Sequence, residues 1–312
     1  MSTKKVFRSA LWCALAVLAL SVQGAPRNGA ADPEEAERLY KIGLSCWRDD
    51  LPSAMKYFRL AAERGHAGAQ YGMGRCYHRM RKFAEATEWY RKAAAQGHAG
   101  AQYQIGNNYY WGTGGMPKNR SKAVYWLTKA AEGGELRAQF QLGLYSYHEA
   151  VPKDYKRAAH WLQKAAAQRD PDARYFLAIC YENGHGVPRD YRQAMLLYRR
   201  AAAKGRFEAY FRMARNYELG RGVPKDPAMA GKCYCRAAEG GVRDAYYMAG
   251  RSCELGRGVN RDIERAVHWY VMAVYSKDER GRRALRRLKR RMPPPPVQYR
   301  GPGNPIIMVP EF

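Results

Sequence analysis

The side chains that first suggest chemistry are Ser53 and Lys56, which form a Ser-x-x-Lys spacing. In the serine enzymes that recognise penicillins, this spacing holds a lysine beside the nucleophilic hydroxyl. Those enzymes also carry Ser-Asp-Asn and Lys-Thr-Gly segments, and neither segment occurs in this sequence. We therefore expect the two residues to lie in the first turn of an ordinary helix, without a catalytic role.

Glycine turns and histidines are the other candidates for a site. The G-x-G turns begin at Gly112, Gly184, Gly220 and Gly256. They lack the third glycine and the preceding strand of a phosphate-binding loop. The histidines recur in matching local sequences, His66 with His98 and His160 with His268. Because such matching indicates duplication of one segment rather than a cluster in space, we expect no metal site and no cofactor.

All of these candidates lie within one repeated segment, whose second half reads approximately A-x-x-W/Y-Y-x-x-A-A. Apolar residues recur there at i, i+3, i+4, i+7 and i+8, the pattern of an amphipathic helix. The closing alanines are Ala61, Ala93, Ala130, Ala165, Ala201, Ala237 and Ala273, which are 32 to 37 residues apart. A self-similar period of this length predicts an all-α solenoid of antiparallel helix pairs, with its function on an extended surface.

The first helix of each pair, helix A, precedes this segment, which is helix B. It has a small residue, then an aliphatic residue and a glycine or alanine, then an aromatic, as in Ala101, Ile105, Gly106 and Tyr109. Glycine within a helix costs about 1 kcal/mol relative to alanine, so its recurrence implies close packing of two helix backbones. The seven predicted units cover about 33–66, 67–98, 99–135, 136–170, 171–206, 207–242 and 243–278.

These residues resemble the Sel-one-like repeat family, a relative of the tetratricopeptide repeats. The segments that carry the resemblance are A-x-x-x-L-G-x-x-Y, G-x-G-V and K-A-x-x-W-Y-x-K-A-A, which recur in phase over residues 33–278. Units 1, 2 and 4 depart from the pattern because they lack the G-x-G-V turn. The resemblance implies a right-handed α/α superhelix that acts as a scaffold for protein interaction, and it does not name the partner.

The N-terminal segment has the three parts of a secretory signal peptide. Three cations in the first eight residues precede an apolar run over 10–20 and a small-residue cleavage site at 22–24. We expect residues 1–24 to be removed before Ala25 and the chain to be exported to the periplasm or the medium, with residues 25–32 as a linker. The apolar run is shorter than the roughly 20 residues that span a membrane. A mitochondrial transit peptide, the alternative, would be more evenly basic.

The chain is strongly basic, with a formal net charge of +26. Residues 280–291 alone carry seven arginines and one lysine without an acid. Such a charge attracts polyanions, which for an exported protein are lipid head groups, cell-wall polymers or acidic proteins rather than nucleic acid. A role in solubility alone is the alternative.

The basic segment also predicts a helix over 279–291. Ala284, Leu285, Leu288 and Met292 form a narrow apolar stripe at helical spacing, so we expect this helix to cap the seventh unit. Its polar face would present Arg282, Arg283, Arg286, Arg287, Lys289, Arg290 and Arg291 as a candidate polyanion patch. The Pro-rich tail, 292–312, is expected to be extended or disordered.

Six cysteines follow residue 24, and an even number permits disulfides in an exported chain. They are Cys46, Cys76, Cys180, Cys233, Cys235 and Cys253. Cys46 and Cys253 take the aromatic position of helix A, and Cys233 takes the tryptophan position of helix B, so packed thiols are the favoured interpretation. Cys46 with Cys76, in neighbouring A helices, is the disulfide to test first. The Cys-x-Cys spacing at 233 and 235 suits neither a metal nor a redox motif.

A binding surface follows from the helical projection of helix A. If the small residue is position 0, positions 4, 5 and 8 point to the core, and we expect positions 3, 6, 7 and 10 to face away. In this repeat class helix A lines the concave side, so the resemblance implies a groove rich in Asn, Gln and Arg. The candidate groove residues are Arg75, Gln104, Asn107, Asn108, Trp111, Gln141, Arg212, Arg215, Asn216 and Arg251. An ordinary solvated face is the alternative.

Three functions remain open from the sequence. We favour an exported, non-catalytic scaffold that binds another protein or peptide in the superhelical groove. The second is binding of an envelope component or another polyanion through the Arg-rich C-terminal helix. The third, hydrolysis of a cell-wall or β-lactam substrate, has been proposed for some members of the resembled family and is disfavoured here. We expect no transmembrane segment in the mature chain, and nucleic acid is a poor fit to an exported protein.

Overall fold

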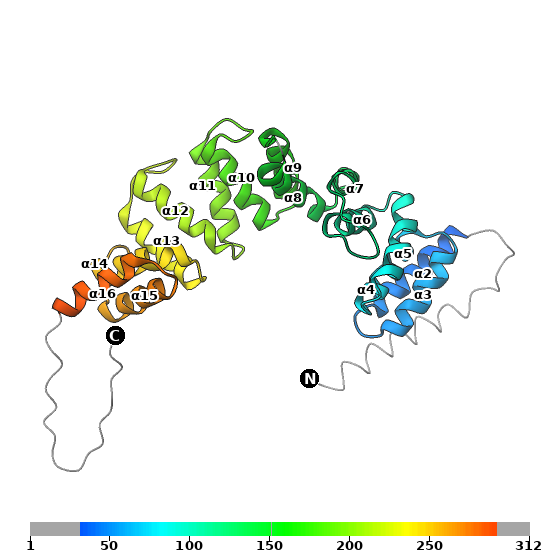
Figure 1. The fold of residues 1–312 in the computed structure, drawn as a ribbon, viewed down its shortest axis with the longest axis horizontal. Helices are drawn as coiled ribbons and strands as arrows, with labels where there is room; N and C mark the ends of the chain where they lie inside the picture. The colour runs from blue at the N-terminus through cyan, green and yellow to red at the C-terminus, as the bar shows by residue number, and fades with distance from the viewer. Residues whose placement is uncertain (1–31, 151, 292–312) are drawn as a thin grey trace, which may run out of the picture. The chain divides into compact units, whose positions relative to one another are not determined.

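The computed structural model describes residues 32–150 and 152–291, and every regular element within them is helical (Figure 1). The signal-peptide segment 1–24, most of the linker and the Pro-rich tail 292–312 lie outside the described residues. None of the described helices is long and apolar enough to cross a membrane. The fold class is thus all-α, as the sequence predicts.

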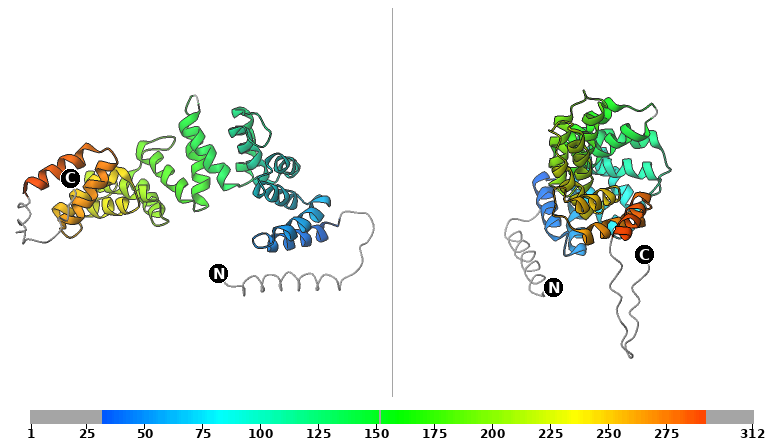
Figure 2. Two further views of the ribbon diagram at one scale, coloured as in Figure 1. Left: turned by 60° about the horizontal axis from the view of Figure 1, so that its bottom comes forward. Right: turned by 90° about the vertical axis from the view of Figure 1, so that its left-hand side faces the viewer.

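Long helices alternate between the A and B types through the described residues (Figure 2), and in six of the pairs the A helix packs on the B helix that follows it. The A helices are α2 (Pro33–Cys46), α4 (Ala67–Arg79), α6 (Ala99–Trp111), α8 (Leu136–Leu144), α10 (Pro171–Asn183), α12 (Phe207–Leu219), α14 (Tyr246–Leu255) and α16 (Glu279–Arg291). The B helices are α3 (Leu51–Glu63), α5 (Phe83–Ala95), α7 (Arg120–Glu132), α9 (Tyr155–Ala167), α11 (Tyr191–Ala202), α13 (Pro227–Glu239) and α15 (Ile263–Tyr275). A π-helix, η1 (Tyr145–Glu149), extends α8, and a 3₁₀ turn, η2 (Arg243–Ala245), precedes α14.

Side-chain caps fix where the helices begin. Asp226 and Asp262 each accept a backbone N–H in the first turn of a B helix, and Asp170 does the same for α10. His66 and His98 replace aspartate at the starts of α4 and α6, where Nδ1 accepts the N–H of Ala69 and of Ala101 respectively. Each cap satisfies a donor that the helix itself leaves unpaired.

The G-x-G turns have two distinct steric reasons for glycine. The first glycine of the turn, such as Gly184 or Gly256, ends the A helix in the left-handed conformation with φ of 73° or 66°. The second glycine allows close approach to the preceding B helix, since a methyl group at Gly258 would lie 1.8 Å from the carbonyl oxygen of Ala228. The turns are therefore joints between neighbouring repeats, and their glycines are explained by packing.

The core of each pair forms where helix A carries its inner glycine. A methyl group at Gly74 would lie 2.5 Å from Cδ1 of Tyr90, and one at Gly43 would lie 2.5 Å from Cδ1 of Phe58. The ring of helix B thus packs directly on the backbone of helix A, which confirms the close approach expected from the sequence. Buried alanines, such as Ala69, complete this contact.

Two compact units divide the chain, one ending at Leu197 and the other beginning at Tyr198 within α11. In the second unit, α16 packs on α15 through Gly281, Ala284 and Leu288, which are buried. Two of the four residues predicted for the apolar stripe, Ala284 and Leu288, are therefore buried as expected. Leu285 is only half-buried, and Met292 lies outside the described residues.

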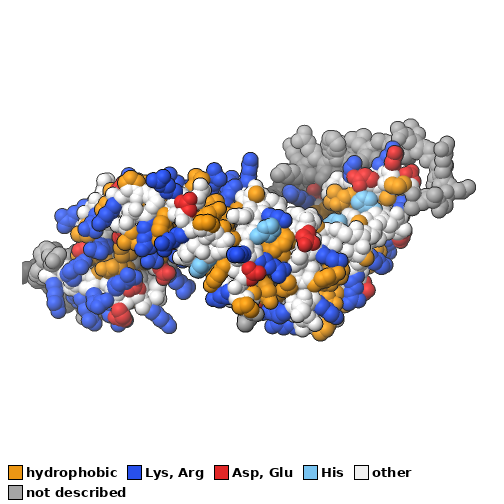
Figure 3. All heavy atoms as spheres, turned by 90° about the horizontal axis from the view of Figure 1, so that it is seen from above, with side chains coloured by type: hydrophobic (Ala, Val, Ile, Leu, Met, Phe, Trp, Pro, Cys, Tyr) orange, Lys and Arg blue, Asp and Glu red, His pale blue; other side chains and the backbone are white. Residues whose placement is uncertain are grey.

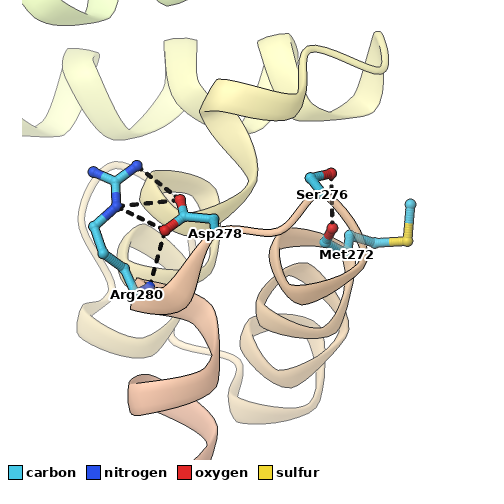
Figure 4. A network of polar contacts seen from close by, with 4 residues as sticks. All are labelled: Met272, Ser276, Asp278 and Arg280. Carbon is cyan, nitrogen blue, oxygen red and sulfur yellow. Dashed lines mark hydrogen bonds and ion pairs between the residues drawn. The ribbon is translucent and has the colours of Figure 1, made fainter.

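Asp278 fixes the start of α16. Its carboxylate accepts hydrogen bonds from the backbone N–H of Arg280 at 2.9 Å and from the guanidinium Nη2 of the same residue at 2.7 Å (Figure 4). These contacts lower the pKa of Asp278. The guanidinium of Arg280 also stacks over the ring of Tyr247 at 4.8 Å, so the first turn of α16 is held against α14.

Candidate interaction surface

The predicted groove positions of helix A divide into exposed and buried sets. Position 7 does not face away from the core: Asn216 is 0% exposed, and Asn108 is half-buried with its amide nitrogen donating to Oγ1 of Thr87 at 2.8 Å. The reason is geometric, because seven steps of about 100° return to within about 20° of position 0, which is buried. Asn216 and Asn108 are therefore corrected from surface to interior residues.

In the first unit, the candidate groove residues are partly occupied by contacts within the chain. The guanidinium of Arg75 lies 4.3 Å from the ring of Trp47 and 5.9 Å from the ring of Tyr71. Gln104, Asn107 and Gln141 are half-buried. Trp111 is the outlier, because 67% of its surface is exposed at the end of α6.

In the second unit, position 6 carries an exposed cation in successive A helices. Arg215 of α12 and Arg251 of α14 are exposed, and Arg287 of α16 takes the same position 36 residues later. Arg212, at position 3, is half-buried and already has an interaction within the chain. The position-6 row of Arg215, Arg251 and Arg287, which we call the arginine row, is the best-defined polar feature of the predicted groove.

Two buried tyrosines of the B helices in this unit are each bonded to a glutamate of the preceding A helix. The hydroxyl of Tyr234 donates to Oε2 of Glu218 at 2.7 Å, and the hydroxyl of Tyr270 donates to Oε2 of Glu254 at 2.6 Å. Burial and the neighbouring carboxylate raise the pKa of both tyrosines, so their hydroxyls remain protonated donors. Arg287 forms an ion pair with the Glu254 carboxylate, which joins the arginine row to the Tyr270 site.

Apart from Arg287, the cations of the predicted polyanion patch lie outside the arginine row. Arg286 and Arg290 of α16 take the positions that Gly250 and Glu254 take in α14, where both contact Tyr270 of the following B helix. Among the described residues no B helix follows α16, so these cations remain exposed at the end of the second unit. We call this surface the end face; its exposed cations are Arg282, Arg283, Arg286, Lys289 and Arg290. The side chain of Arg291 lies outside the described residues.

Positive charge is also widespread beyond these two surfaces. Lysine and arginine side chains outnumber acidic ones on the face drawn in Figure 3. Several of the cations of α16 are nevertheless paired: Arg282 contacts Glu279 at 2.9 Å, and Arg280 contacts Asp278. The cations available to a ligand are thus fewer than the sequence count suggests.

Ser53 and Lys56 lie in the first turns of α3, as the sequence predicts. The backbone N–H of Ser53 donates to Oδ1 of Asp50 at 3.0 Å, and hydrogen bonds from Ser53 lower the pKa of Asp50. Lys56 is exposed, with Nζ 5.9 Å from the ring of Tyr57. The two residues serve the helix start and its surface, and no contact between them is present in the described structure.

The paired histidines are separated in space by their different roles. His66 and His98 cap helices, whereas His160 and His268 are exposed on B helices beside a tryptophan. Within residues 32–150 and 152–291, no group of three or more histidine, cysteine, aspartate or glutamate side chains could hold a metal ion.

The six cysteines of the described residues are all buried, and none of them is in a disulfide in the structure. Cys46 and Cys76 belong to one core cluster with Phe58 and Met73, so their disulfide stays a prediction. Burial raises the pKa of Cys76 to about 11 and that of Cys180 to about 12, which makes both unreactive as nucleophiles near neutral pH.

Sequence reasoning missed an aromatic joint around η1. The hydroxyl of Tyr147 lies 2.8 Å from Nδ1 of His185, and the His185 ring stacks on Tyr155 with centroids 4.2 Å apart. Glu149, at the end of η1, contacts the Tyr110 hydroxyl and Arg120 of the preceding repeat. The absence of a G-x-G turn in the fourth unit was the available signal that this joint is built differently.

An open cavity of about 810 Å³ lies next to that joint. It is formed by the turn before α9 and the G-x-G turn after α10, and its lining includes Lys153, Lys156 and Val187. Asp154 faces the same space but already caps α9 through the N–H of Arg157. The cavity is thus lined by exposed lysines and by a carboxylate that already caps a helix, and we assign no site to it.

Comparison with known proteins identifies the repeat. The sequence model of the Sel1 repeat matches residues 48–66, 67–98, 99–135, 136–170, 171–205, 207–242 and 243–278. The chain belongs to the Sel1 repeat family. Proteins of this family generally act as scaffolds for protein–protein interaction. No match is found among curated proteins.

Two solved Sel1 repeat structures resemble this chain. One is a protective antigen of uropathogenic Escherichia coli with an SLR fold, at 29% identity and a TM-score of 0.74 over 82% of this chain. The chain spans 57% of that antigen's length. The other is a Sel1 repeat protein of Oxalobacter formigenes, at 30% identity and a TM-score of 0.64, with 75% of this chain and 96% of that one covered. Both support a solenoid of helix pairs.

Proposed function

We propose that this Sel1 repeat protein is an exported, non-catalytic scaffold that binds an acidic segment of a partner protein along the arginine row. The observation that carries the proposal is the recurrence of Arg215 and Arg251 at one helical position, exposed and one repeat apart. An extended chain with carboxylates at matching intervals could pair with both guanidiniums, which bind carboxylates in a bidentate manner. Export rests on the signal-peptide pattern of residues 1–24.

Charge reversal of the arginine row tests the binding surface. The double variant Arg215→Glu with Arg251→Glu is compared with wild type for binding of a fluorescent oligoglutamate peptide, measured by anisotropy. Exposed ion pairs contribute up to about 1 kcal/mol each, so loss of two should weaken binding about tenfold or more. Unchanged affinity would refute the proposed surface.

A matched control separates the row from net charge. Lys232 is exposed on α13, a B helix of the same unit, and Lys232→Glu with Arg257→Glu changes the net charge by the same amount. We expect this control to weaken peptide binding far less than the row variant. If both variants lose affinity equally, general electrostatic attraction accounts for the binding instead.

Export has its own experiment. Expression of the full chain with fractionation of the cells, followed by mass measurement of the N-terminus, should give a protein that begins at Ala25 outside the cytoplasm. An intact N-terminus on cytoplasmic protein would contradict this part of the proposal and leave the binding surface to be judged separately.

The second candidate function is attachment to an anionic envelope surface through the end face. It is favoured by the five exposed cations that α16 presents where no further helix of the described residues covers them. Each cation near an anionic membrane contributes about 1 kcal/mol, and salt screens this attraction. Binding to phosphatidylglycerol vesicles should be lost in high salt and when the five residues become Gln, while the Arg215→Glu and Arg251→Glu variant still binds. Vesicle binding that survives the Gln variant would exclude the end face.

A further inference from the structure

The cysteines of the second unit include one pair that the sequence spacing did not single out. Cys235 lies on α13 and Cys253 on α14, and they are 3% and 0% exposed. The Cys253 thiol is the first cause of the raised pKa of the Cys235 thiol, ahead of burial, so the two side chains lie beside each other. A thiol sulfur is one bond beyond Cβ, so two thiols can act on each other only where the helix backbones lie close together.

Glycine at the preceding turn of α13 explains this closeness. Gly231 lies four residues before Cys235 and thus on the same face of the helix. A methyl group at Gly231 would lie 1.9 Å from the carbonyl oxygen of Arg257 and 3.2 Å from Oγ of Ser252, the residue before Cys253. The face of α13 that carries Cys235 therefore packs against the end of α14 that carries Cys253.

The equivalent positions one repeat earlier also contact each other. Arg199 and Tyr217 precede Cys235 and Cys253 by 36 residues each, and Nη2 of Arg199 donates to the Tyr217 hydroxyl at 2.8 Å. In that repeat two long side chains bridge the joint between a B helix and the next A helix. In the last repeat two short thiols occupy the equivalent positions.

We propose that Cys235 and Cys253 form a disulfide that links α13 to α14 across the joint between the sixth and seventh repeats. The oxidant is a disulfide, either a small molecule such as oxidised glutathione or the disulfide of another protein. One thiolate attacks the donor and releases the first donor thiol; the other thiolate then attacks this mixed disulfide and releases the second. Two protein thiols and one donor disulfide thus become one protein disulfide and two donor thiols.

Burial determines when this exchange occurs. Because the donor has no access to either sulfur in the folded unit, the exchange takes place before α14 docks on α13 or when the two helices separate transiently. After closure, burial protects the bond from reducing thiols. Cys46 and Cys76 share a core cluster in the first unit, and the disulfide predicted between them is a separate question.

Peptide mapping under non-reducing conditions tests the pairing. The full chain is refolded in a mixture of reduced and oxidised glutathione, its remaining thiols are alkylated, and it is digested with trypsin. We expect a cross-linked species of residues 233–236 with residues 252–257, lighter by two hydrogen atoms than the sum of the two peptides. If these peptides carry only alkylated cysteines while the protein is fully refolded, the proposal is refuted.

Cys233 lies in the same tryptic peptide as Cys235, so variants must assign the bond. Cys233→Ser should keep the cross-link, whereas Cys235→Ser should lose it. A cross-link that persists in Cys235→Ser and disappears in Cys233→Ser would assign the bond to the wrong residue and overturn the proposal. Because a serine at a buried position can impair folding, the circular dichroism of each variant is compared with that of wild type. If a variant does not fold, the peptide map of the wild-type protein still tests the proposal.

Discussion

The Tyr270 hydroxyl donates a hydrogen bond of 2.6 Å to the Glu254 carboxylate, and Tyr270 joins a B helix to the A helix before it. The same pair recurs one repeat earlier as Tyr234 and Glu218. In the last repeat Arg287 also contacts the carboxylate, so the terminal helix α16 is anchored by an ion pair to a buried acid. The cap is thus held by a polar contact as well as by its apolar stripe.

Arg287→Ala should therefore destabilise the second unit more than other changes on α16. Removal of the guanidinium leaves the buried carboxylate of Glu254 without its cation, and since Arg287 is itself partly exposed we expect a loss of about 1 to 2 kcal/mol. Chemical denaturation monitored by circular dichroism measures the change. Arg286→Ala, one residue earlier and exposed, is the control and should change the free energy of unfolding by less than about 0.5 kcal/mol.

The inner glycines of the A helices should not tolerate alanine. In Gly74→Ala the added methyl group would lie 2.5 Å from the ring of Tyr90, which is buried. The strain of overpacking, about 1 to 3 kcal/mol, exceeds the roughly 1 kcal/mol that alanine gains in helix propensity. A net loss of stability in thermal denaturation is expected, and a more stable variant would contradict the packing argument.

The equivalent position in the fifth repeat provides the reverse experiment. Ala178 is fully buried there, so that repeat accommodates the methyl group. Ala178→Gly should lower stability by about 1 kcal/mol or more, because it loses helix propensity and leaves a small void. At this position alanine should thus destabilise the second repeat, whereas glycine should destabilise the fifth.

Ser53→Ala tests the remaining enzymatic interpretation. Since Ser53 contacts Asp50 at the start of α3, we expect a loss of at most about 1 kcal/mol in stability. Hydrolysis of nitrocefin by the wild-type protein should not exceed that of a sample without protein. Turnover that disappears in Ser53→Ala while the fold is intact would restore the hydrolase hypothesis.

The sequence was sufficient for the parts of the fold that repeat, and insufficient for contacts that occur once. Gly74 was expected to allow close helix packing, and the ring of Tyr90 lies on it because the same close approach recurs in other units, at Gly43, Gly106, Gly143 and Gly250. Asn216 was misplaced because position 7 was projected incorrectly onto the outer face of helix A, whereas the side chain is fully buried. The pairing of Arg287 with Glu254 was beyond sequence reasoning, since a charged run has no period that selects one partner.

Protonation of His98 should make the stability of the first unit depend on pH. Nδ1 of His98 accepts a hydrogen bond from the backbone N–H of Ala101 at 3.2 Å. The imidazole ring of His98 stacks on the ring of Tyr71, with centroids 4.5 Å apart. Burial lowers the pKa of His98 below its usual 6.5. The unfolded chain therefore binds a proton more readily than the folded chain, and the contribution of His98 to stability is complete above pH 6.5. It is lost as the pH falls from 6.5 through the lowered pKa of the folded state.

His98→Asp separates this effect from general acid denaturation. Asp170 shows that an aspartate caps the equivalent A helix of the fifth repeat, where it accepts the N–H of Ala173 at 2.7 Å. The variant should keep the cap near neutral pH and show a smaller loss of unfolding free energy between pH 7 and about pH 5 than wild type. His160→Asp, on an exposed face, is the control and should leave the pH dependence of wild type unchanged. Identical pH profiles for wild type and His98→Asp would show that protonation of this histidine is not linked to unfolding.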